Sequence, residues 1–424
     1  MRRVLVAAVL PAILAVACGS TGREENPTRS SSPTATRTND VLVLGGANGT
    51  SVLDATGHVV ADLGQVIGAP GWTVAFARDI DSAGNTAVRI IDARTGMTKR
   101  SVQLTGRWTR VAEYGVGNSP SGVSPNGRWL VLADPKPERV AYQVIDTTGS
   151  AQPKRIELAG RFSFDAISDN GESLFLVERL DGTKYRVRVA DVRSGLLVPG
   201  AVVDVKQVAT SADENGVMNG SYTTATAGPG GEWYFSVYQH PTKGPYIHAL
   251  NMRARIAQCI LDLPTFGSAG ALEMAKQPFW SLAVDDYHGI ARLYAVNGAL
   301  GRIAVVDPYE IRVKRSATFK VPAAGPGPAA FAPQTGAAVS PDGYRLYALG
   351  ETGIFLIDPT DLSLRATFAQ GSAFRSLAVS PDNATLYALA ADGRSVTLLD
   401  ARTGRPSTTL RLARAADSIA VQKP

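Results

Sequence analysis

The sequence predicts an all-β fold, a single β-propeller built from four-stranded blades. Three observations lead to this prediction. An apolar strand ending in Asp or Asn recurs along the chain, a Ser-Pro-Asp-Gly type of turn precedes most copies, and the last short strand has no hairpin partner of its own. Units of roughly 40–60 residues with four short strands and tight turns are typical of propeller blades.

The first marker is the strand that ends in an acidic or amide residue and is followed by a short turn, which often closes with Gly. Asp and Asn accept hydrogen bonds from backbone amides two residues on, and Gly takes the positive φ that closes a hairpin. The copies end at Asp54, Asp92, Asp146, Asp191, Asn251, Asp307, Asp358 and Asp400. Eight copies favour eight blades. Seven remain possible, because no clear first strand lies between Leu63 and Trp72.

The second marker is a turn that comes before an aliphatic–aromatic strand, as in Ala338–Gly343 and Ala378–Asn383. Pro at the second turn position presets φ, and Gly or Asn then accepts the left-handed position. Ser376–Thr409 combines both markers and is the cleanest unit of the chain.

This pattern resembles the YVTN and WD-repeat-like family of propellers, in which such turns recur. The resemblance covers residues 41–422 and is strongest over 330–412, while the Gly-His and Trp-Asp pairs of true WD repeats are missing. It implies a bacterial extracytoplasmic propeller.

The two ends of the repeat region predict how the ring closes. The first unit starts at Val41 directly with its second strand, whereas Ser418–Val421 matches the first strand of a blade and nothing follows it. We therefore expect the C-terminal strand to complete the first blade, which removes an exposed sheet edge.

The N-terminus predicts export and lipid anchoring. Arg2 and Arg3 precede the apolar segment Val4–Ala17, which meets Cys18, as in a signal peptide. Because the ending Ala15–Cys18 resembles a bacterial lipobox, we expect residues 1–17 to be a signal peptide and Cys18 to be lipidated. An uncleaved anchor and ordinary secretory cleavage are the alternatives.

The predicted domains follow from the expected signal peptide and lipidation site. Residues 18–40 hold the lipidated Cys and a disordered tether rich in Ser, Thr and Pro, and residues 41–424 form the propeller. The expected location is the cell membrane, with the protein lipid-anchored and facing outside the cytoplasm. With Cys18 lipidated, Cys259 has no disulfide partner and is expected as a buried thiol in a strand.

The net charge of +6 is scattered along the chain, which argues against a nucleic-acid partner. We expect a monomer whose partners are the membrane, through Cys18, and a protein, peptide or glycan ligand. No catalytic residue, metal site or cofactor is predicted. The tryptophan-docking motif of quinoprotein dehydrogenases, for example, would need Trp where this chain has Arg100 and Thr408.

The candidate binding residues lie in loops between strands. They are His240 in one loop and a local cluster of Asp285, Asp286 and His288 in another, and a role for them in binding on a loop face is a hypothesis. Two insertions, Lys206–Tyr222 and Thr265–Trp280, stand out from the repeat, and the second contains a possible helical turn, ALEMAK.

The favoured function is a non-enzymatic binding or scaffold module. The alternative is an enzyme of the lactonase or hydrolase type. Lactonase-type propellers have similar repeats and place His, Glu and Arg near the central opening, so the site of such an enzyme would lie at the mouth of the channel.

Overall fold

The computed structural model describes residues 39–111, 121–202, 216–264, 271–287, 291–322 and 335–422. The chain divides into two units, Met1–Arg37 and Thr38–Pro424, and the described residues all belong to the second. The predicted signal peptide, Cys18 and nearly all of the tether therefore lie outside the described residues.

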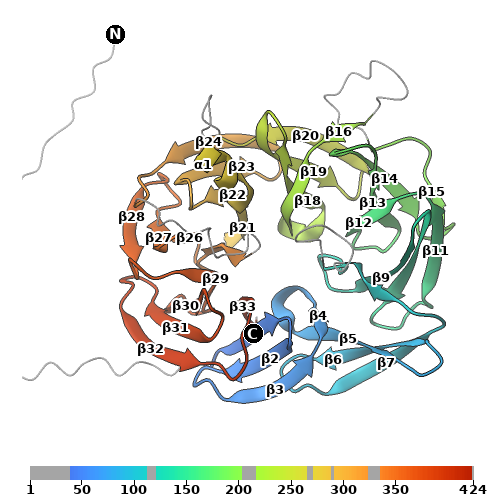
Figure 1. Ribbon diagram of the computed structural model, residues 1–424, viewed down its shortest axis with the longest axis horizontal. Coiled ribbons are helices and arrows are strands. Elements are labelled where there is room, and N and C mark those ends of the chain that lie inside the picture. Colours follow the sequence, from blue (N-terminus) through green and yellow to red (C-terminus); the bar gives the residue numbers. More distant parts are fainter. Residues whose placement is uncertain are drawn as a thin grey trace, which may run out of the picture. The chain divides into compact units, whose positions relative to one another are not determined.

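The described residues between 39 and 422 form a ring of eight four-stranded antiparallel blades, which confirms the predicted propeller (Figure 1). In each blade the strand named first here lies nearest the middle of the ring. Blade 1 contains β33 (Ser418–Val421), β1 (Val41–Gly46), β2 (Gly49–Asp54) and β3 (Val59–Gly64). Blade 2 contains β4 (Val66–Gly68), β5 (Val74–Ile80), β6 (Thr86–Asp92) and β7 (Thr98–Leu104). Blade 3 contains β8 (Thr109–Arg110), β9 (Trp129–Lys136), β10 (Arg139–Asp146) and β11 (Lys154–Ala159).

Blades 4 to 8 repeat this order. Blade 4 contains β12 (Phe162–Ile167), β13 (Ser173–Arg179), β14 (Lys184–Asp191) and β15 (Leu196–Leu197), and β16 (Met218–Asn219) also pairs with β14. Blade 5 contains β17 (Ser221–Ala227), β18 (Trp233–His240), β19 (Gly244–Asn251) and β20 (Ile256–Asp262). Blade 6 contains β21 (Ser281–Asp285), β22 (Arg292–Asn297), β23 (Arg302–Asp307) and β24 (Arg312–Thr318). Blade 7 contains β25 (Ala337–Val339), β26 (Leu346–Gly350), β27 (Gly353–Ile357) and β28 (Leu364–Phe368). Blade 8 contains β29 (Phe374–Val379), β30 (Thr385–Ala390), β31 (Ser395–Asp400) and β32 (Pro406–Arg411).

Helical structure among the described residues is confined to short segments between strands. The 3-10 turns η1 (Pro70–Trp72) and η3 (Pro229–Gly231) each follow the first strand of a blade. Helix α1 (Ala271–Lys276), the helical turn expected from ALEMAK, leads into the 3-10 turn η4 (Gln277–Phe279) ahead of blade 6.

The ring closes as predicted. Strand β33 pairs antiparallel with β1, in a register that places Leu42 opposite Val421 and Gly45 opposite Ser418. Strand β4, only three residues long, supplies the first strand of blade 2 that the sequence did not reveal, which settles the blade count at eight.

The turns after the marker strands have the chemistry that the sequence predicts. At Asp400, Oδ1 accepts hydrogen bonds from the backbone N of Arg402 at 3.0 Å and of Thr403 at 2.8 Å, and Gly404 has a φ of 68°. These acidic residues are therefore bonded within their own turns.

Because each blade has four antiparallel strands, the chain enters and leaves every blade on the same face of the ring. We call the end that holds the turns after each first strand, such as Ser340–Gly343, the turn face. The opposite end holds the connections between blades and the turns after each second strand, and we call it the connection face.

The turns on the turn face also join neighbouring blades. Asp169 Oδ1 accepts from the backbone N of Asn126 at 2.8 Å, and the Asp169 carbonyl accepts from Trp129 Nε1 at 3.1 Å. Likewise, the backbone N of Asp342 donates to Asn383 Oδ1 at 2.9 Å. The recurring turn therefore links blades as well as reversing the chain.

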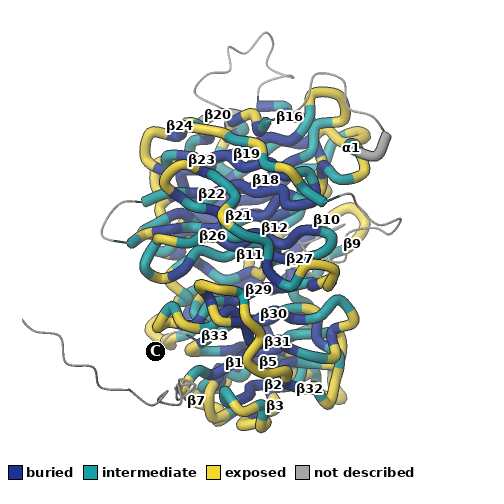
Figure 2. Tube along the Cα trace, turned by 90° about the vertical axis from the view of Figure 1, so that its left-hand side faces the viewer, coloured by how far each residue is buried: buried dark blue, intermediate teal, exposed yellow. Residues whose placement is uncertain are grey.

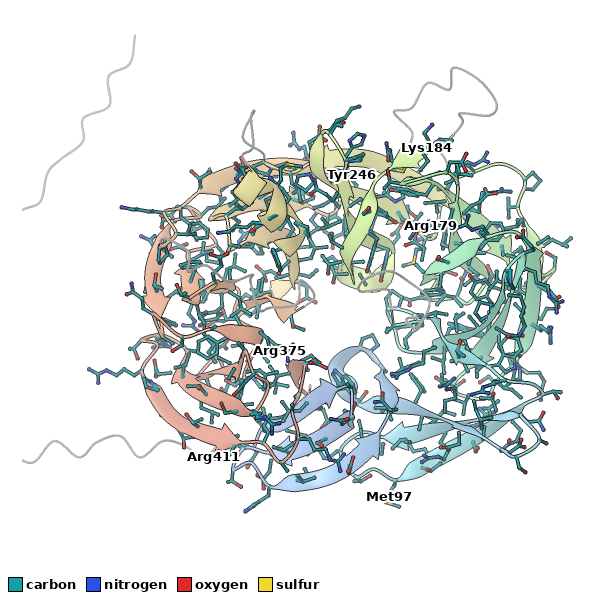
Figure 3. The ribbon with its side chains drawn as sticks, in the orientation of Figure 1. Met97, Arg179, Lys184, Tyr246, Arg375 and Arg411 are labelled. Carbon is teal, nitrogen blue, oxygen red and sulfur yellow. The ribbon has the colours of Figure 1, made fainter. Side chains whose placement is uncertain are left out.

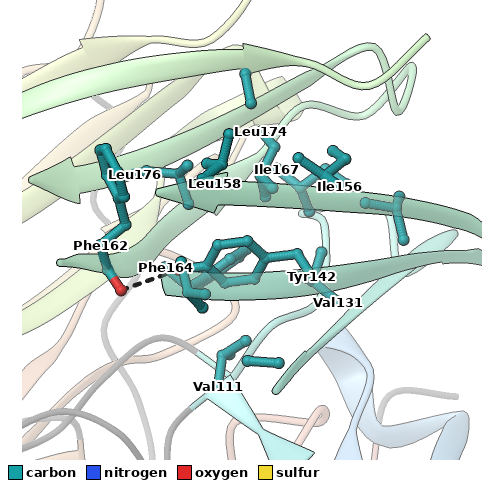
Figure 4. Close-up of a cluster of buried hydrophobic side chains, with 14 of the residues drawn as sticks. Val111, Val131, Tyr142, Ile156, Leu158, Phe162, Phe164, Ile167, Leu174 and Leu176 are labelled. Atoms are coloured by element: carbon teal, nitrogen blue, oxygen red, sulfur yellow. Dashed lines mark hydrogen bonds between the residues drawn. The ribbon is translucent and has the colours of Figure 1, made fainter. Parts of the chain in front are cut away.

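The core is divided among the contacts between blades. Figure 2 shows buried residues along the strands and many of the exposed ones in turns. One cluster, between blades 3 and 4, includes Val131, Tyr142 and Phe164, and the Tyr142 hydroxyl donates to the Phe162 carbonyl at 3.2 Å (Figure 4). Such interfaces hold each blade to the next and fix the loops above them.

Candidate functional site

His240, one of the predicted site residues, lies at the end of β18 on the connection face. Its Nδ1 accepts hydrogen bonds from the backbone N of Thr242 at 3.1 Å and of Lys243 at 3.0 Å. Partial burial and the charge of Lys243 lower the pKa of the imidazole, which favours the neutral form. In this arrangement the ring nitrogen organises its own turn.

Asp285 and Asp286 lie on the turn face, at and just after the end of β21. Burial raises the pKa of Asp285, while a 3.0 Å hydrogen bond from the backbone N of Tyr287 to its Oδ1 opposes the shift. His288, predicted with them, lies outside the described residues. Because β18 is a second strand and β21 a first strand, the structure places His240 and the two acids on opposite faces of the ring.

A cleft of ≈ 610 Å³ opens on the connection face between blades 3, 4 and 5. We call it the arginine cleft. Its walls come from the turn after β9, the connection into β12, the turn after β13 and the start of β17. It is lined by Pro135, Lys136, Pro137, Arg139, Val140, Gly160, Arg161, Phe162, Ser163, Arg179, Leu180, Gly182, Thr183, Gly220, Ser221 and Tyr222.

The lining of the arginine cleft contains four cationic side chains and no acidic one. Lys136 Nζ lies 3.0 Å from Asp134, and Arg139 forms an ion pair with Glu157. Within the described ranges, neither Arg161 nor Arg179 forms an ion pair with a carboxylate, which distinguishes them from the other two cations of the cleft. Figure 3 labels Arg179, which lies nearer the middle of the ring than Lys184.

Asp165 lies two residues beyond the cleft residue Ser163 in β12, at an irregularity of the ladder between Phe164 and Ala166. Only 3% of its surface is exposed. Burial raises the pKa of this carboxyl to about 7, and the positive charge of Arg179 opposes the rise. One guanidinium group therefore acts on a buried acid and also lines the cleft.

Stacked phenol rings pack beside Asp165, between blades 4 and 5. Tyr238 stacks on Tyr185 at 4.7 Å and on Tyr246 at 5.7 Å between ring centroids. The Tyr185 and Tyr246 hydroxyls lie 3.0 Å apart, and Tyr246 donates to the Asn219 carbonyl at 3.1 Å. Burial raises the pKa of each phenol, which keeps these groups neutral.

Sequence reasoning missed the arginine cleft because its residues come from four separate loops. One signal was present: Asp165 interrupts the apolar strand Phe162–Ile167, at a position where a charge is costly unless it has a partner. That signal could have marked Asp165, but it could not have selected Arg161 and Arg179 among the many arginines of the chain.

A second cleft, of ≈ 550 Å³, lies where blades 1 and 2 meet and includes Trp72, Arg110 and Asp417. Arg110 already donates to the Gln65 side chain at 2.8 Å and to the Val66 carbonyl at 3.3 Å. Asp417 lies 3.0 Å from Arg375. The charged groups of this second cleft are already bonded within the protein. It therefore has fewer charged groups available to bind a ligand than the arginine cleft has.

The described residues contain neither a cluster of metal ligands nor a membrane-spanning helix. No group of three or more His, Cys, Asp or Glu side chains in that part of the chain could hold a metal ion. Likewise, none of the helices among those residues has the length and apolar character of a membrane span.

Comparisons with known proteins agree with the fold. The sequence matches no family model and no curated protein. Among solved structures, apo AztD from Citrobacter koseri aligns with a TM-score of 0.52 and 13% identity, covering 90% of this chain and 97% of that chain. A crystal structure of Citrobacter koseri AztD aligns with a TM-score of 0.53 and 12% identity, covering 90% of this chain and 98% of that chain.

The dihydro-heme d1 dehydrogenase NirN, in complex with DHE, aligns with a TM-score of 0.53 and 12% identity, covering 91% of this chain and 75% of that chain. At such identities the likeness shows the propeller fold alone. The resemblance to the YVTN and WD-repeat-like family stays a prediction.

Proposed function

We propose that this protein is a membrane-anchored propeller that works outside the cytoplasm as a binding module, with the arginine cleft as its ligand site. The observation that carries this proposal is the cleft itself, a concave, charge-bearing site that loops of three blades form on a rigid frame. Binding sites for small ligands commonly have volumes of about 300–1,000 Å³ and a few well-placed polar groups.

The size of the cleft narrows the expected ligand. A folded protein partner usually covers about 800 Å² of each surface, whereas a cleft of ≈ 610 Å³ suits the end of a chain or a small molecule. Of the protein, peptide or glycan ligands expected from the sequence, the end of a glycan or of a short peptide therefore fits better than a protein surface.

Plugging the cleft tests this function. Thr183 is an exposed residue of its wall, and we expect Thr183→Trp to weaken ligand binding at least about tenfold by filling the space. The full-length protein in detergent would be applied to an array of glycans and peptides. The matched control is Ser150→Trp, a change at an exposed turn residue on the turn face, which should keep the binding. Either no bound compound at all or binding that survives the Thr183→Trp plug would contradict the proposal.

The lipid anchor is tested separately. In a bacterial host with the lipoprotein pathway, we expect Cys18→Ser to move the protein from the membrane fraction to the soluble fraction, because an acyl chain contributes about 0.8 kcal/mol per buried CH₂. Immunoblotting of the two fractions gives the measurement. Ser20→Ala, two residues away, should leave the distribution unchanged. A Cys18→Ser protein that still sediments with membranes would refute the anchor.

A further inference from the structure

We propose that the arginine cleft binds a sugar that carries an anionic group, held by Arg161 and Arg179, and that the binding is coupled to proton uptake by Asp165. This inference rests on the proposed function, because it takes the cleft to be the ligand site. It adds the chemical class of the ligand and a link between binding and pH.

The lining of the arginine cleft is positively charged. Lys136, Arg139, Arg161 and Arg179 line the cleft, and its lining contains no carboxylate. Glu138 and Asp181 lie in the same turns but are exposed and do not belong to the lining. A concave surface that gathers charges of one sign attracts ligands of the opposite sign.

The guanidinium groups of Arg161 and Arg179 differ from the other two cations of the lining in their ion pairing. Lys136 and Arg139 are already held by carboxylates outside the cleft, whereas Arg161 and Arg179 have no ion-pair partner among the described residues. The two residues are held side by side, because the backbone N of Arg179 donates to the Arg161 carbonyl at 2.9 Å. A planar guanidinium group presents paired donors that match a carboxylate or a sulfate, and two adjacent groups can hold one anionic group together.

The neutral part of the lining favours a sugar. The hydroxyl residues of the lining are Ser163, Thr183 and Ser221, of which Thr183 donates to Asn219, and its aromatic residues are Tyr222 and the largely buried Phe162. Hydroxyls can exchange hydrogen bonds with sugar hydroxyls, and aromatic surface can pack against the apolar face of a sugar ring. A peptide end would use the same guanidinium groups but fewer of the hydroxyls, so it serves as an alternative outcome of the test.

The position of Asp165 links the site to pH. This carboxyl is only 3% exposed and lies two residues along β12 from the cleft residue Ser163, and Arg179, which lines the cleft, is the cation that acts on it. The other groups that interact with it electrostatically are phenols on β14, β17 and β18, namely Tyr185, Tyr222, Tyr234 and Tyr238. These phenols are neutral, so the balance between the charged and protonated acid depends mainly on burial and on Arg179.

The direction of the coupling follows from electrostatics. Arg179 favours the charged form of Asp165, and an anion bound at Arg179 offsets that influence and adds a negative charge nearby. The pKa of Asp165 then rises further above about 7, and the carboxyl takes up a proton as the ligand binds. Linkage therefore requires tighter binding as the pH falls from 8 to 6, by at most about tenfold per pH unit for one proton.

The test uses the full-length protein in detergent and probes whose charge is constant between pH 6 and 8. Methyl glucuronide and glucose 6-sulfate carry a carboxylate and a sulfate on a sugar, methyl glucoside is their neutral match, and N-acetyl-dialanine carries a peptide carboxylate. Isothermal titration calorimetry in two buffers of different ionisation enthalpy gives both the affinity and the protons taken up. We expect at least one acidic sugar to bind with proton uptake and methyl glucoside not to bind.

Single substitutions test which residues are responsible for the binding and for the proton uptake. Arg161→Gln and Arg179→Gln should each weaken binding of the acidic sugar about 10- to 100-fold, because each removes a charge-assisted hydrogen bond. Arg107→Gln, a change at an exposed arginine outside the cleft, is the matched control and should bind normally. Asp165→Asn should keep the binding but lose both the proton uptake and the pH dependence. Circular dichroism checks that each variant is folded.

The outcomes separate this inference from the proposed function. If the array yields a neutral ligand whose binding Thr183→Trp abolishes, the cleft is a binding site but the anionic class is wrong. If N-acetyl-dialanine binds and the acidic sugars do not, the sugar class is overturned. Binding that Arg161→Gln and Arg179→Gln leave unchanged, or pH dependence that persists in Asp165→Asn, would overturn the assigned roles.

Discussion

Removing residues 418–424 is expected to open the ring and abolish the single cooperative unfolding transition of the propeller. These residues include β33, the innermost strand of blade 1, which pairs with β1 and also contacts blade 8. The backbone N of Ile419 donates to the Ser376 side chain at 2.9 Å, so the strand joins two blades that are far apart in sequence. Urea unfolding followed by circular dichroism, together with limited proteolysis of β1, gives the measurement.

A single substitution tests the same closure more gently. Ile419 is 2% exposed, and Ile419→Ala should lower the free energy of unfolding by about 2–5 kcal/mol, since it removes buried apolar volume between blades 1 and 8. The control is Val59→Ala in outer strand β3, where the side chain is 56% exposed and the expected change is within about 0.5 kcal/mol. A shortened chain that unfolds at the same urea concentration as the intact one would show that β33 does not hold the ring closed.

This closure could be predicted from the sequence because it follows from counting strands. The first unit lacked a strand, the last strand had no hairpin, and an exposed sheet edge is unfavourable. Strand β4 escaped notice for the opposite reason. Its three residues, Val66–Gly68, are too few to show a period of two, and tertiary pairing with β5 makes them a strand.

The tryptophan-docking motif of quinoprotein dehydrogenases is only half matched around Arg100. Comparing the motif does not show which residue of the neighbouring blade Arg100 contacts. Gly149 of blade 3 has a φ of 86°, and a side chain added there would overlap the Arg100 guanidinium of blade 2. Arg100 thus packs on the neighbouring blade's turn glycine from the position where the quinoprotein motif has Trp. The spacing was informative, but the packing partner became visible only in three dimensions.

The arginine cleft was beyond sequence reasoning for a related physical reason. Along the chain Arg179 resembles Arg186 and Arg188, which share Glu178 as their ion-pair partner at 3.4 and 3.0 Å. What distinguishes Arg179 is that its charge acts on Asp165 and that its backbone bonds to Arg161, which lies on the connection into β12. Such differences depend on how blades pack, and a local pattern does not carry them.

The second large effect is expected at α1, the helix ahead of blade 6. Arg302 is 1% exposed; its Nη1 donates to the Pro264 carbonyl at 3.1 Å, and its Nη2 pairs with Glu273 of α1. Glu273→Ala would remove the carboxylate of this ion pair while the Arg302 charge stays buried. Breaking a buried pair in this way typically costs about 3–5 kcal/mol, and we expect a loss of that order in the free energy of unfolding, measured in urea.

Two further variants decide whether the charge itself is responsible for the loss. Glu273→Leu combined with Arg302→Met replaces the pair by apolar groups of similar size and should recover most of the stability, because both desolvation costs disappear together. Glu310→Ala is the control, since this carboxylate pairs with Lys314 while 51% exposed and should contribute at most about 1 kcal/mol. A double variant as unstable as Glu273→Ala would mean that the shape of the contact between α1 and blade 6, and not the ion pair between Glu273 and Arg302, holds this insertion in place. If the charge is responsible, α1 is tied to blade 6 by an interaction whose partners cannot be changed one at a time.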